Sequence, residues 1–256
     1  MGEVRPESRP PRAGRRRSTR PRAVAEALLV DRLSAQLADW QSRRGLSDYA
    51  VTDLGGGTGT LAMNLAEAGH RVTVVDPSLD ALASLQRRTA ERGLGDRLQG
   101  IQGDAGNLVE LLGEASTDVM ICHRTLEVVD DPATALTAMA TAVRPGGVLS
   151  VVVPQRRAAV ISQALQGHIG AALEAIDDPA RFDLDQVLSM INDAGFSVTD
   201  IEGIGVLSHH VPAAMIESEP GLADQLYELE SRISRDPAFR AIAAWAHIFA
   251  VRGSLR

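Results

Sequence analysis

The stretch from Val51 to Asp76 constrains the fold of this chain more than any other part of the sequence. It reads VTDLGGGTGTLAMNLAEAGHRVTVVD, with a short apolar run ending at Asp53, a turn with glycine at 55, 56, 57 and 59, an amphipathic segment, and a second apolar run before Asp76. This order predicts a strand, a tight turn, a helix and a second strand. Such a unit binds a nucleotide-like ligand at the carboxyl ends of parallel strands.

The residue types in this unit fit a ligand site. Glycines let the backbone approach a ligand closely, and the carboxylate of Asp76 can accept hydrogen bonds from ribose hydroxyls. The dinucleotide fingerprint G-x-G-x-x-G is incomplete, because position 60 is Thr60, whereas Asp53-x-Gly55-x-Gly57-x-Gly59 is met in full. A nicotinamide site, or a glycine-rich turn without a ligand, remains an alternative at this point.

The rest of the chain predicts further strands and helices in alternation. Apolar periodicity predicts helices over Ala23–Arg44, Ser78–Arg92 (with Ser78 as N-cap), Ala133–Val143, Ala158–Ile176, Leu184–Ala194 and Pro220–Ile233, and strands over Leu98–Gln102, Thr117–His123, Val148–Val153, Phe196–Ile201 and Ala246–Val251. A turn, Arg144–Gly147, is expected before the fifth strand. The fold class is therefore α/β, a doubly wound Rossmann-like sheet of about seven strands with an antiparallel last strand.

Composition sets the domain organisation and compartment. The chain has 256 residues, of which 45% are hydrophobic, so we expect a single domain over residues 23–256, with helical insertions on the substrate side around 155–180 and 209–243. The one cysteine, Cys122, rules out an internal disulfide and fits a reducing, cytoplasmic environment. No apolar run approaches the roughly 18 residues of a membrane span, so no membrane association is expected.

Residues 1–22 differ in composition from the remainder. They carry eight arginines against Glu3 and Glu7, and they are rich in proline, serine and glycine without hydrophobic periodicity. This composition predicts a disordered basic tail. Such a tail could contact RNA phosphates, but a solvated extension is the simpler interpretation.

His123 is the first candidate for a catalytic residue. It follows a buried-type strand at the edge where cofactor and substrate meet in this fold, whereas Cys122 points to the other face and is expected to pack. His209 and His210 are secondary candidates that are expected to be loop residues. The six histidines have no metal-ligand spacing, so no metal site is expected.

The five core motifs between residues 49 and 153 resemble those of class I S-adenosylmethionine-dependent methyltransferases. A closer resemblance is to the tRNA carboxymethoxyuridine methyltransferases and their actinobacterial relatives, and it spans residues 23–252. It is carried by the runs Cys122–Pro132, Pro145–Pro154, Ala164–Gly167, Tyr227–Arg232 and Ala246–Ile248. Those enzymes methyl-esterify a carboxymethoxy group on the wobble uridine of tRNA.

The resemblance implies S-adenosylmethionine as cofactor and gives roles to matching residues. It places Gly55 and Gly56 against the methionine part, Asp76 on the ribose, Asp104 and Ala105 near the adenine, and His123 beside the sulfonium. An arginine that contacts the cofactor carboxylate in relatives matches Arg22 or Arg20, and we assign Arg22. The full cofactor-binding set is Asp53, Gly55, Gly56, Gly57, Gly59, Asp76, Asp104, Ala105, His123 and Arg22. Taken without the resemblance, Asp104 is equally well explained as a helix cap.

The sequence leaves more than one possibility for the methyl acceptor. Where relatives commonly show G-V-R-V-F-S-D, this chain reads GIGVLSH over Gly203–His209, and Asp177–Pro179 replaces a basic insertion. Both changes remove positive charge from the side where tRNA would bind. The predicted function is methyl esterification of tRNA; the alternatives are methylation of a small molecule and a cofactor-binding protein with impaired catalysis. A carboxylate acceptor needs no general base, whereas a hydroxyl or amine acceptor would make His123 the natural base.

Overall fold

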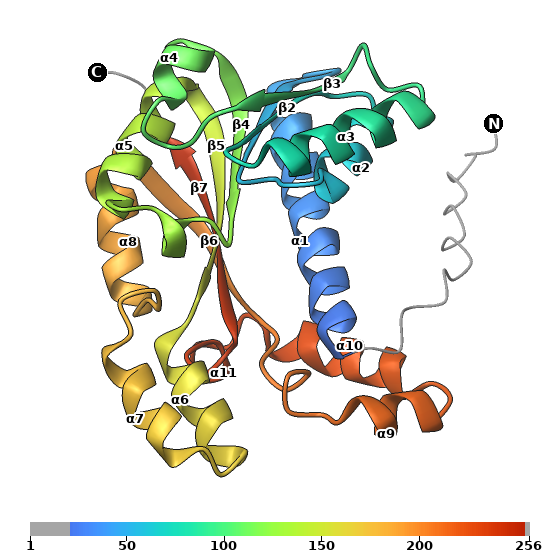
Figure 1. Ribbon diagram of the computed structural model, residues 1–256, viewed down its shortest axis with the longest axis vertical. Helices are drawn as coiled ribbons and strands as arrows, with labels where there is room; N and C mark the ends of the chain where they lie inside the picture. Colours follow the sequence, from blue (N-terminus) through green and yellow to red (C-terminus); the bar gives the residue numbers. More distant parts are fainter. Residues whose placement is uncertain (1–20, 254–256) are drawn as a thin grey trace, which may run out of the picture.

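The computed structural model describes residues 21–253, and its centre is one seven-stranded sheet (Figure 1). The strand order is β3-β2-β1-β4-β5-β7-β6. Strands β1 to β5 run parallel, and β7 lies antiparallel between β5 and β6. This confirms the predicted fold class. The strands are β1 (Ala50–Leu54), β2 (Arg71–Asp76), β3 (Leu98–Gln102), β4 (Thr117–His123), β5 (Val143–Pro154), β6 (Phe196–Ile204) and β7 (Trp245–Arg252).

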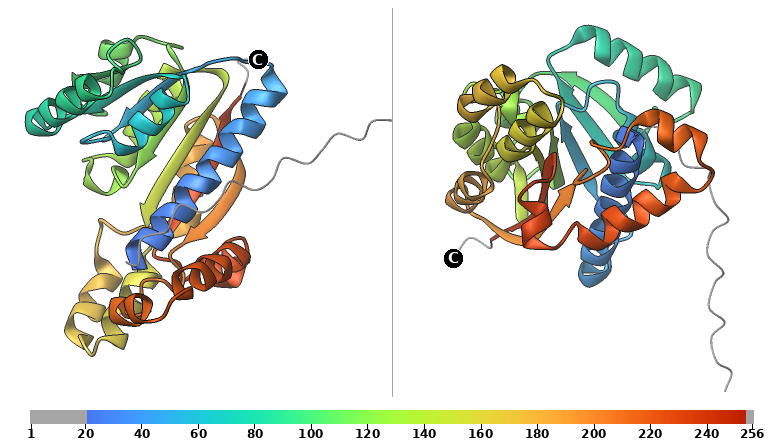
Figure 2. Two further views of the ribbon diagram at one scale, coloured as in Figure 1. Left: turned by 90° about the vertical axis from the view of Figure 1, so that its right-hand side faces the viewer. Right: turned by 90° about the horizontal axis from the view of Figure 1, so that it is seen from below.

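Helices cover both faces of the sheet (Figure 2). One face carries α1 (Pro21–Arg44), α2 (Thr60–Glu67) and α3 (Leu79–Glu91); the other carries α4 (Leu108–Leu112), α5 (Pro132–Ala142) and α8 (Leu184–Asp193). Neighbouring residues of β4 alternate between the two hydrophobic cores, because strand side chains point to opposite faces. Ile121 packs under α1, and Cys122, which is buried as predicted, packs under α5.

The N-terminal parts of α3 and α1 bear on two of the predictions. Ser78 caps α3, and its hydroxyl accepts a hydrogen bond from the Ala81 amide at 3.2 Å, as predicted. Helix α1 includes Pro21 and Arg22, so these two residues belong to a helix and not to the predicted tail. Residues 1–20 of that tail lie outside the described residues.

The single helix expected over Ala158–Ile176 is wrong. Two helices occupy this segment, α6 (Arg156–Leu165) and α7 (Ile169–Asp177). Gly167 adopts a left-handed conformation with φ +79°, its amide donates to the Ala164 carbonyl, and the His168 amide donates to Gln163. This Schellman motif ends α6, because only glycine enters the left-handed region without strain.

The turn expected over Arg144–Gly147 is also different. Strand β5 begins at Val143, directly after α5, and residues 144–147 form a bulge opposite Asp118 in β4. A β-carbon on Gly147 would lie 2.7 Å from the Asp118 carbonyl oxygen, so the close approach of the two strands requires glycine.

The remaining helices gather at the end of the molecule toward which β5 runs (Figure 1). Between β6 and β7 lie α9 (Ala213–Ser218), α10 (Leu222–Ile233) and α11 (Pro237–Arg240), of which the sequence predicted only α10. Together with α6 and α7 they place helical segments near the two regions expected as insertions. Within residues 21–253, no helix has the length and apolar character needed to cross a membrane.

Candidate functional site

Two adjoining cavities lie at the carboxyl ends of β1, β2 and β4. The first has a volume of about 350 Å³ and lies between α1, the glycine loop and the tip of β4. The second, about 380 Å³, lies between the ends of β1 and β2 and the loops after β3 and β4. Both are lined by Gly55 and Arg124, so the two cavities meet at these residues.

The glycine loop can be built only from small residues. Gly55 has φ +73°, and a β-carbon there would lie 2.2 Å from Thr125 Oγ1, which donates a hydrogen bond to the Leu54 carbonyl. A β-carbon on Gly56 would lie 2.5 Å from Asp53 Oδ2. Both glycines line the first cavity, so the backbone itself forms part of the cavity wall.

Gly57 and Gly59 shape the loop without lining either cavity. The Gly57 amide donates to Asp76 Oδ2 at 2.8 Å. Gly59 precedes α2 with φ +72°, and a β-carbon there would lie 2.3 Å from a methyl carbon of Leu85. These two glycines therefore position the loop against β2 and α3.

Asp53 lies beneath the loop in the wall of the first cavity, with only 4% of its surface exposed. Burial, together with the nearby charge of Asp76, raises the pKa of Asp53 to about 7. A carboxyl group held in this way gains from a cationic partner in the cavity, since a positive charge would favour its ionised form.

Asp76 and Asp104 both line the second cavity, together with Ala105. Asp76 is already oriented by the backbone, because Oδ2 accepts from Gly57 and Oδ1 accepts from the Ser78 amide at 2.9 Å. Asp104 is not a helix cap: its Oδ1 accepts from the Gly106 amide at 2.8 Å, and Asn107 is the N-cap of α4. The second cavity thus combines three aspartates, of which Asp130 is the third, with an apolar wall that includes Val128 and Val129.

Arg124 stands between the cavities in a left-handed conformation, φ +57°, which is uncommon for a residue with a side chain. Its guanidinium carbon lies 5.4 Å from the centre of the Trp245 ring, at cation–π distance. The guanidinium of Arg22 lies 5.9 Å from the same ring and also pairs with Glu26, whose side chain lines the first cavity. Arg22 is therefore near the first cavity but not among its lining residues.

His209 packs edge-on against the same Trp245 ring, with 5.0 Å between ring centres. It belongs to a turn after β6 that is held by Glu230 of α10. The buried Glu230 carboxylate accepts three backbone hydrogen bonds, from Val206 at 2.9 Å, Leu207 at 2.8 Å and Ser208 at 2.6 Å. Neither His209 nor His210 lines the two cavities.

His123 lies in the wall of the first cavity and is tied to a second histidine through a serine. His123 Nε2 lies 2.8 Å from Ser150 Oγ, which in turn lies 2.9 Å from His247 Nε2. Burial, with smaller contributions from His247 and Arg124, holds the pKa of His123 well below its usual value, and burial lowers that of His247 to about 4. These lowered pKa values favour the neutral form of both rings and make His123 a weak base.

Sequence reasoning missed several residues that shape this site. Arg124 directly follows the predicted strand tip, and this position could have indicated it. Ser150, Glu230 and His247 lie within runs that carry the family resemblance, but no role at the site was assigned to them or to Trp245, since they reach the site from strands and helices far along the chain. Within the described part of the chain, no group of three histidine, cysteine or acidic side chains is arranged to hold a metal ion.

Comparisons with known proteins agree with this geometry. A family model described as a methyltransferase domain matches residues 52–151. The tRNA 5-carboxymethoxyuridine methyltransferase of Escherichia coli (strain K12) is 25% identical over 235 residues, covering 89% of this chain and 87% of that enzyme. The ubiquinone biosynthesis O-methyltransferase of Burkholderia pseudomallei (strain 1710b) is 30% identical over 161 residues, covering 60% of this chain and 67% of that enzyme.

Among solved structures, the plantazolicin methyltransferase BamL has the same fold. That crystal structure, a complex with a triazolic desmethylPZN analogue and SAH, superposes with a TM-score of 0.59 at 14% identity, covering 88% of this chain and 85% of BamL. The strand order, the glycine loop and the acid at the end of β2 define a Rossmann-like enzyme with a nucleoside cofactor. The chain belongs to the class I S-adenosylmethionine-dependent methyltransferases.

Proposed function

We propose that the two adjoining cavities together hold S-adenosylmethionine, with the methionine end in the first and the adenosine end in the second. Glu26, together with Asp53 once a cation favours its ionised form, gives the first cavity the negative charge that suits an ammonium and a sulfonium group. In the second cavity, Asp76 offers carboxylate oxygens to ribose hydroxyls, and Ala105, Val128 and Val129 offer apolar surface to a base. The cofactor supplies a methyl group on a cationic sulfur.

Replacement of Asp76 tests this assignment. Loss of one or two hydrogen bonds to a charged group, at about 1.5–3 kcal/mol each, should weaken cofactor binding by roughly 10- to 100-fold or more in Asp76→Ala. Asp80→Ala is the matched control, because Asp80 lies in the exposed first turn of α3 and lines neither cavity. Affinities are measured by isothermal titration calorimetry; equal affinity of Asp76→Ala and the unaltered chain would refute the site.

We infer that the methyl acceptor is the carboxylate of a carboxymethoxy group on a tRNA wobble uridine. The match to the E. coli tRNA enzyme extends over 89% of this chain, well beyond the methyltransferase domain at residues 52–151, and this extent is the observation that carries the inference. Arg22 and Arg124 beside the Trp245 ring provide cations and an aromatic face near the first cavity, which suit a carboxylate attached to a base.

The main requirement of this reaction is that the protein holds the two reactants in the correct position. Methyl transfer from a sulfonium requires the acceptor oxygen to be held in line with the methyl group and shielded from water. A carboxylate acceptor is ionised at neutral pH and loses no proton. The low pKa of His123 is compatible with this reaction, because no residue has to act as a strong base.

Transfer of labelled methyl groups tests the acceptor. The full chain is incubated with methyl-labelled S-adenosylmethionine and, in parallel, with tRNA bearing unesterified carboxymethoxyuridine and with a small-metabolite extract. We expect label in the tRNA that is released as methanol by mild alkali, since methyl esters are alkali-labile. Alkali-stable label in either sample would contradict esterification.

Methylation of a small hydroxyl compound is the second candidate. His123 lies in the wall of the first cavity, and the B. pseudomallei relative is an O-methyltransferase. This function predicts alkali-stable label in the metabolite sample only. Cofactor binding with no label in either sample would instead favour a cofactor-binding protein with impaired catalysis.

A further inference from the structure

A row of buried polar side chains crosses the sheet beneath α1. It runs through four neighbouring strands, from the partly buried His123 of β4 to the buried Ser150 of β5, His247 of β7 and Glu202 of β6. Ser150 and Glu202 are fully buried, and His247 is 1% exposed. The row separates two hydrophobic clusters, one containing Val148 and Phe249 and the other Val152 and Ile204. Polar groups at this depth require hydrogen-bond partners.

Two atoms of this row have no hydrogen-bond partner among the described residues, and they belong to facing residues. Glu202 of β6 pairs directly with His247 of β7 in the antiparallel ladder, so their side chains leave the same face of the sheet about 5 Å apart at the β-carbons. The unpartnered atoms are His247 Nδ1 and Glu202 Oε2. A hydrogen bond between them, direct or through one water, would satisfy both atoms.

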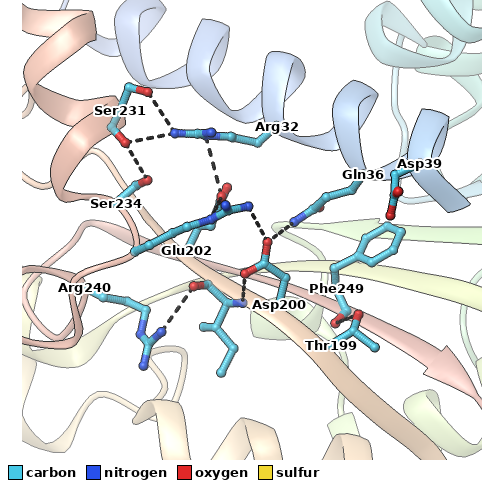
Figure 3. Close-up of polar contacts among 12 residues, drawn as sticks. Arg32, Gln36, Asp39, Thr199, Asp200, Glu202, Ser231, Ser234, Arg240 and Phe249 are labelled. Atoms are coloured by element: carbon cyan, nitrogen blue, oxygen red, sulfur yellow. Dashed lines mark hydrogen bonds and ion pairs between the residues drawn. The ribbon is translucent and has the colours of Figure 1, made fainter.

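Glu202 is anchored on its other side by arginines. Arg235 Nε donates to Glu202 Oε1 at 2.7 Å, and Arg32 Nε of α1 lies 3.6 Å from the same oxygen. Figure 3 shows Arg32 and Gln36 pointing from α1 toward Glu202 and Asp200 of β6. Burial raises the pKa of Glu202, and the two guanidinium groups oppose that rise. The two guanidinium groups favour the ionised form of Glu202, and an ionised carboxylate only accepts hydrogen bonds.

A group at one end that only accepts hydrogen bonds determines which atom carries each proton along the row. If Glu202 accepts, His247 Nδ1 carries the proton and His247 Nε2 is left to accept from the Ser150 hydroxyl. Ser150 Oγ then accepts from His123 Nε2, which must carry a proton. In a neutral ring this leaves the lone pair of His123 on Nδ1, the ring nitrogen not engaged by Ser150.

We propose that Glu202, His247 and Ser150 are positioning residues that fix the tautomer of His123, so that its Nδ1 presents a lone pair to the first cavity. The benefit of this arrangement rests on the proposed function of that cavity. A lone pair attracts the cationic end of the cofactor, whereas an N–H group or a charged imidazolium would repel it. Glu202, on the edge strand β6, thereby sets the polarity of the cavity wall.

Nuclear magnetic resonance of the ligand-free full chain tests the proton order directly. In long-range ¹H–¹⁵N correlation spectra of ¹⁵N-histidine-labelled protein, we expect the Nε2–H tautomer for His123 and the Nδ1–H tautomer for His247. His123→Gln and His247→Gln assign the two rings. An Nδ1–H tautomer at His123 in the unaltered chain would overturn the proposal.

Glu202→Gln gives the sharper test, because it should reverse the direction of every hydrogen bond in the row as far as His123. The amide oxygen stays on the Arg235 guanidinium, so the NH₂ group takes the place of Oε2 and donates to His247 Nδ1. His247 then carries its proton on Nε2, Ser150 donates to His123 Nε2, and His123 becomes the Nδ1–H tautomer. Unchanged tautomers of both rings in Glu202→Gln would refute the coupling.

Two further variants separate the coupling from general loss of structure. Asp200→Asn is the matched control, since Asp200 also pairs with Arg235 but faces Phe249 in the ladder, and it should leave both tautomers unchanged. Ser150→Ala interrupts the row, so the tautomer of His123 should no longer follow that of His247; it decides the question if Glu202→Gln does not fold. These spectra need neither cofactor nor acceptor, so calorimetry with S-adenosylmethionine reports separately on the proposed function.

Discussion

Asp53 illustrates how a single buried carboxyl group can link the cavity to the stability of the protein. Its pKa in the folded chain is about 7, far above the value of an exposed aspartate. Between these two pKa values, the folded state holds a proton that the unfolded state has lost. The contribution of Asp53 to the free energy of unfolding is therefore level below about pH 4, falls as the pH rises toward about 7, and is level again above that.

We expect Asp53→Asn to remove this pH dependence. The difference in unfolding free energy between the unaltered chain and Asp53→Asn should change with a slope approaching ~1.4 kcal/mol per pH unit between about pH 4.5 and 6.5. Urea unfolding at four pH values measures it, and Asp80→Asn, at an exposed position, serves as control. Parallel pH curves for Asp53→Asn and the unaltered chain would contradict the raised pKa.

The sequence could predict those site residues whose place in space follows from their place in one local unit. Asp76, the glycines and His123 occupy strand ends and a tight turn, where position along one local unit determines position in space. Ser150 and His247 meet His123 only because β4, β5 and β7 are neighbours in the sheet. Ser150 lies 27 residues after His123, and His247 lies 97 residues after Ser150. No local sequence pattern predicts a contact of this kind.

Among the elements, the turn after β6 depends on one side chain from another element. The three amides of residues 206–208 all donate to the Glu230 carboxylate of α10, and the next residue, His209, packs on Trp245. The turn therefore connects α10 to the aromatic group near the first cavity. Its stability is an electrostatic property of a buried carboxylate and three aligned amides.

We expect Glu230→Gln to lower the free energy of unfolding by about 2 kcal/mol, because the amide has one accepting oxygen and its NH₂ group faces a buried amide donor. Urea denaturation measures the loss. Glu228→Gln is the control in the same helix: Glu228 is exposed, pairs with Arg232 one turn away, and should change stability by no more than about 0.5 kcal/mol. Equal effects of the two substitutions would argue against a special role for Glu230.

Element boundaries were predictable where periodicity and caps agree, and less so where a glycine changes the backbone locally. The apolar spacing of residues 158–176 continues through Gly167, so periodicity alone could not reveal that the backbone turns left-handed there. The bulge in β5 depends on contact with Asp118 of β4, and a contact between two strands cannot be predicted from the sequence of β5 alone. Short helices such as α9 have too few residues for a periodic signal.

At the scale of the whole molecule, the cavities join parts of the chain that are far apart in sequence, namely α1, the glycine loop and the ends of β2 and β4. A ligand that occupies both should therefore stabilise the fold globally. At a concentration 100 times its dissociation constant, S-adenosylmethionine should stabilise the folded state by about 2.7 kcal/mol. For a protein of this size, that corresponds to a rise in melting temperature of roughly 5–10 °C.

Differential scanning calorimetry with increasing cofactor measures this rise, and Asp76→Ala should need a correspondingly higher concentration to show it. Adenosine alone, which fills only one proposed end, is a suitable comparison and should give a smaller shift at the same concentration. No shift at saturating S-adenosylmethionine would contradict binding across both cavities.

The contact between Gly55 and Thr125 also bears on the design of inhibitors and on resistance to them. A compound that bridges the two cavities must pass Gly55, where they meet. Selection cannot readily block that passage by enlarging Gly55, since its backbone is left-handed and any added β-carbon would lie 2.2 Å from Thr125 Oγ1. Escape by this route requires two coordinated changes, which makes the junction a durable target.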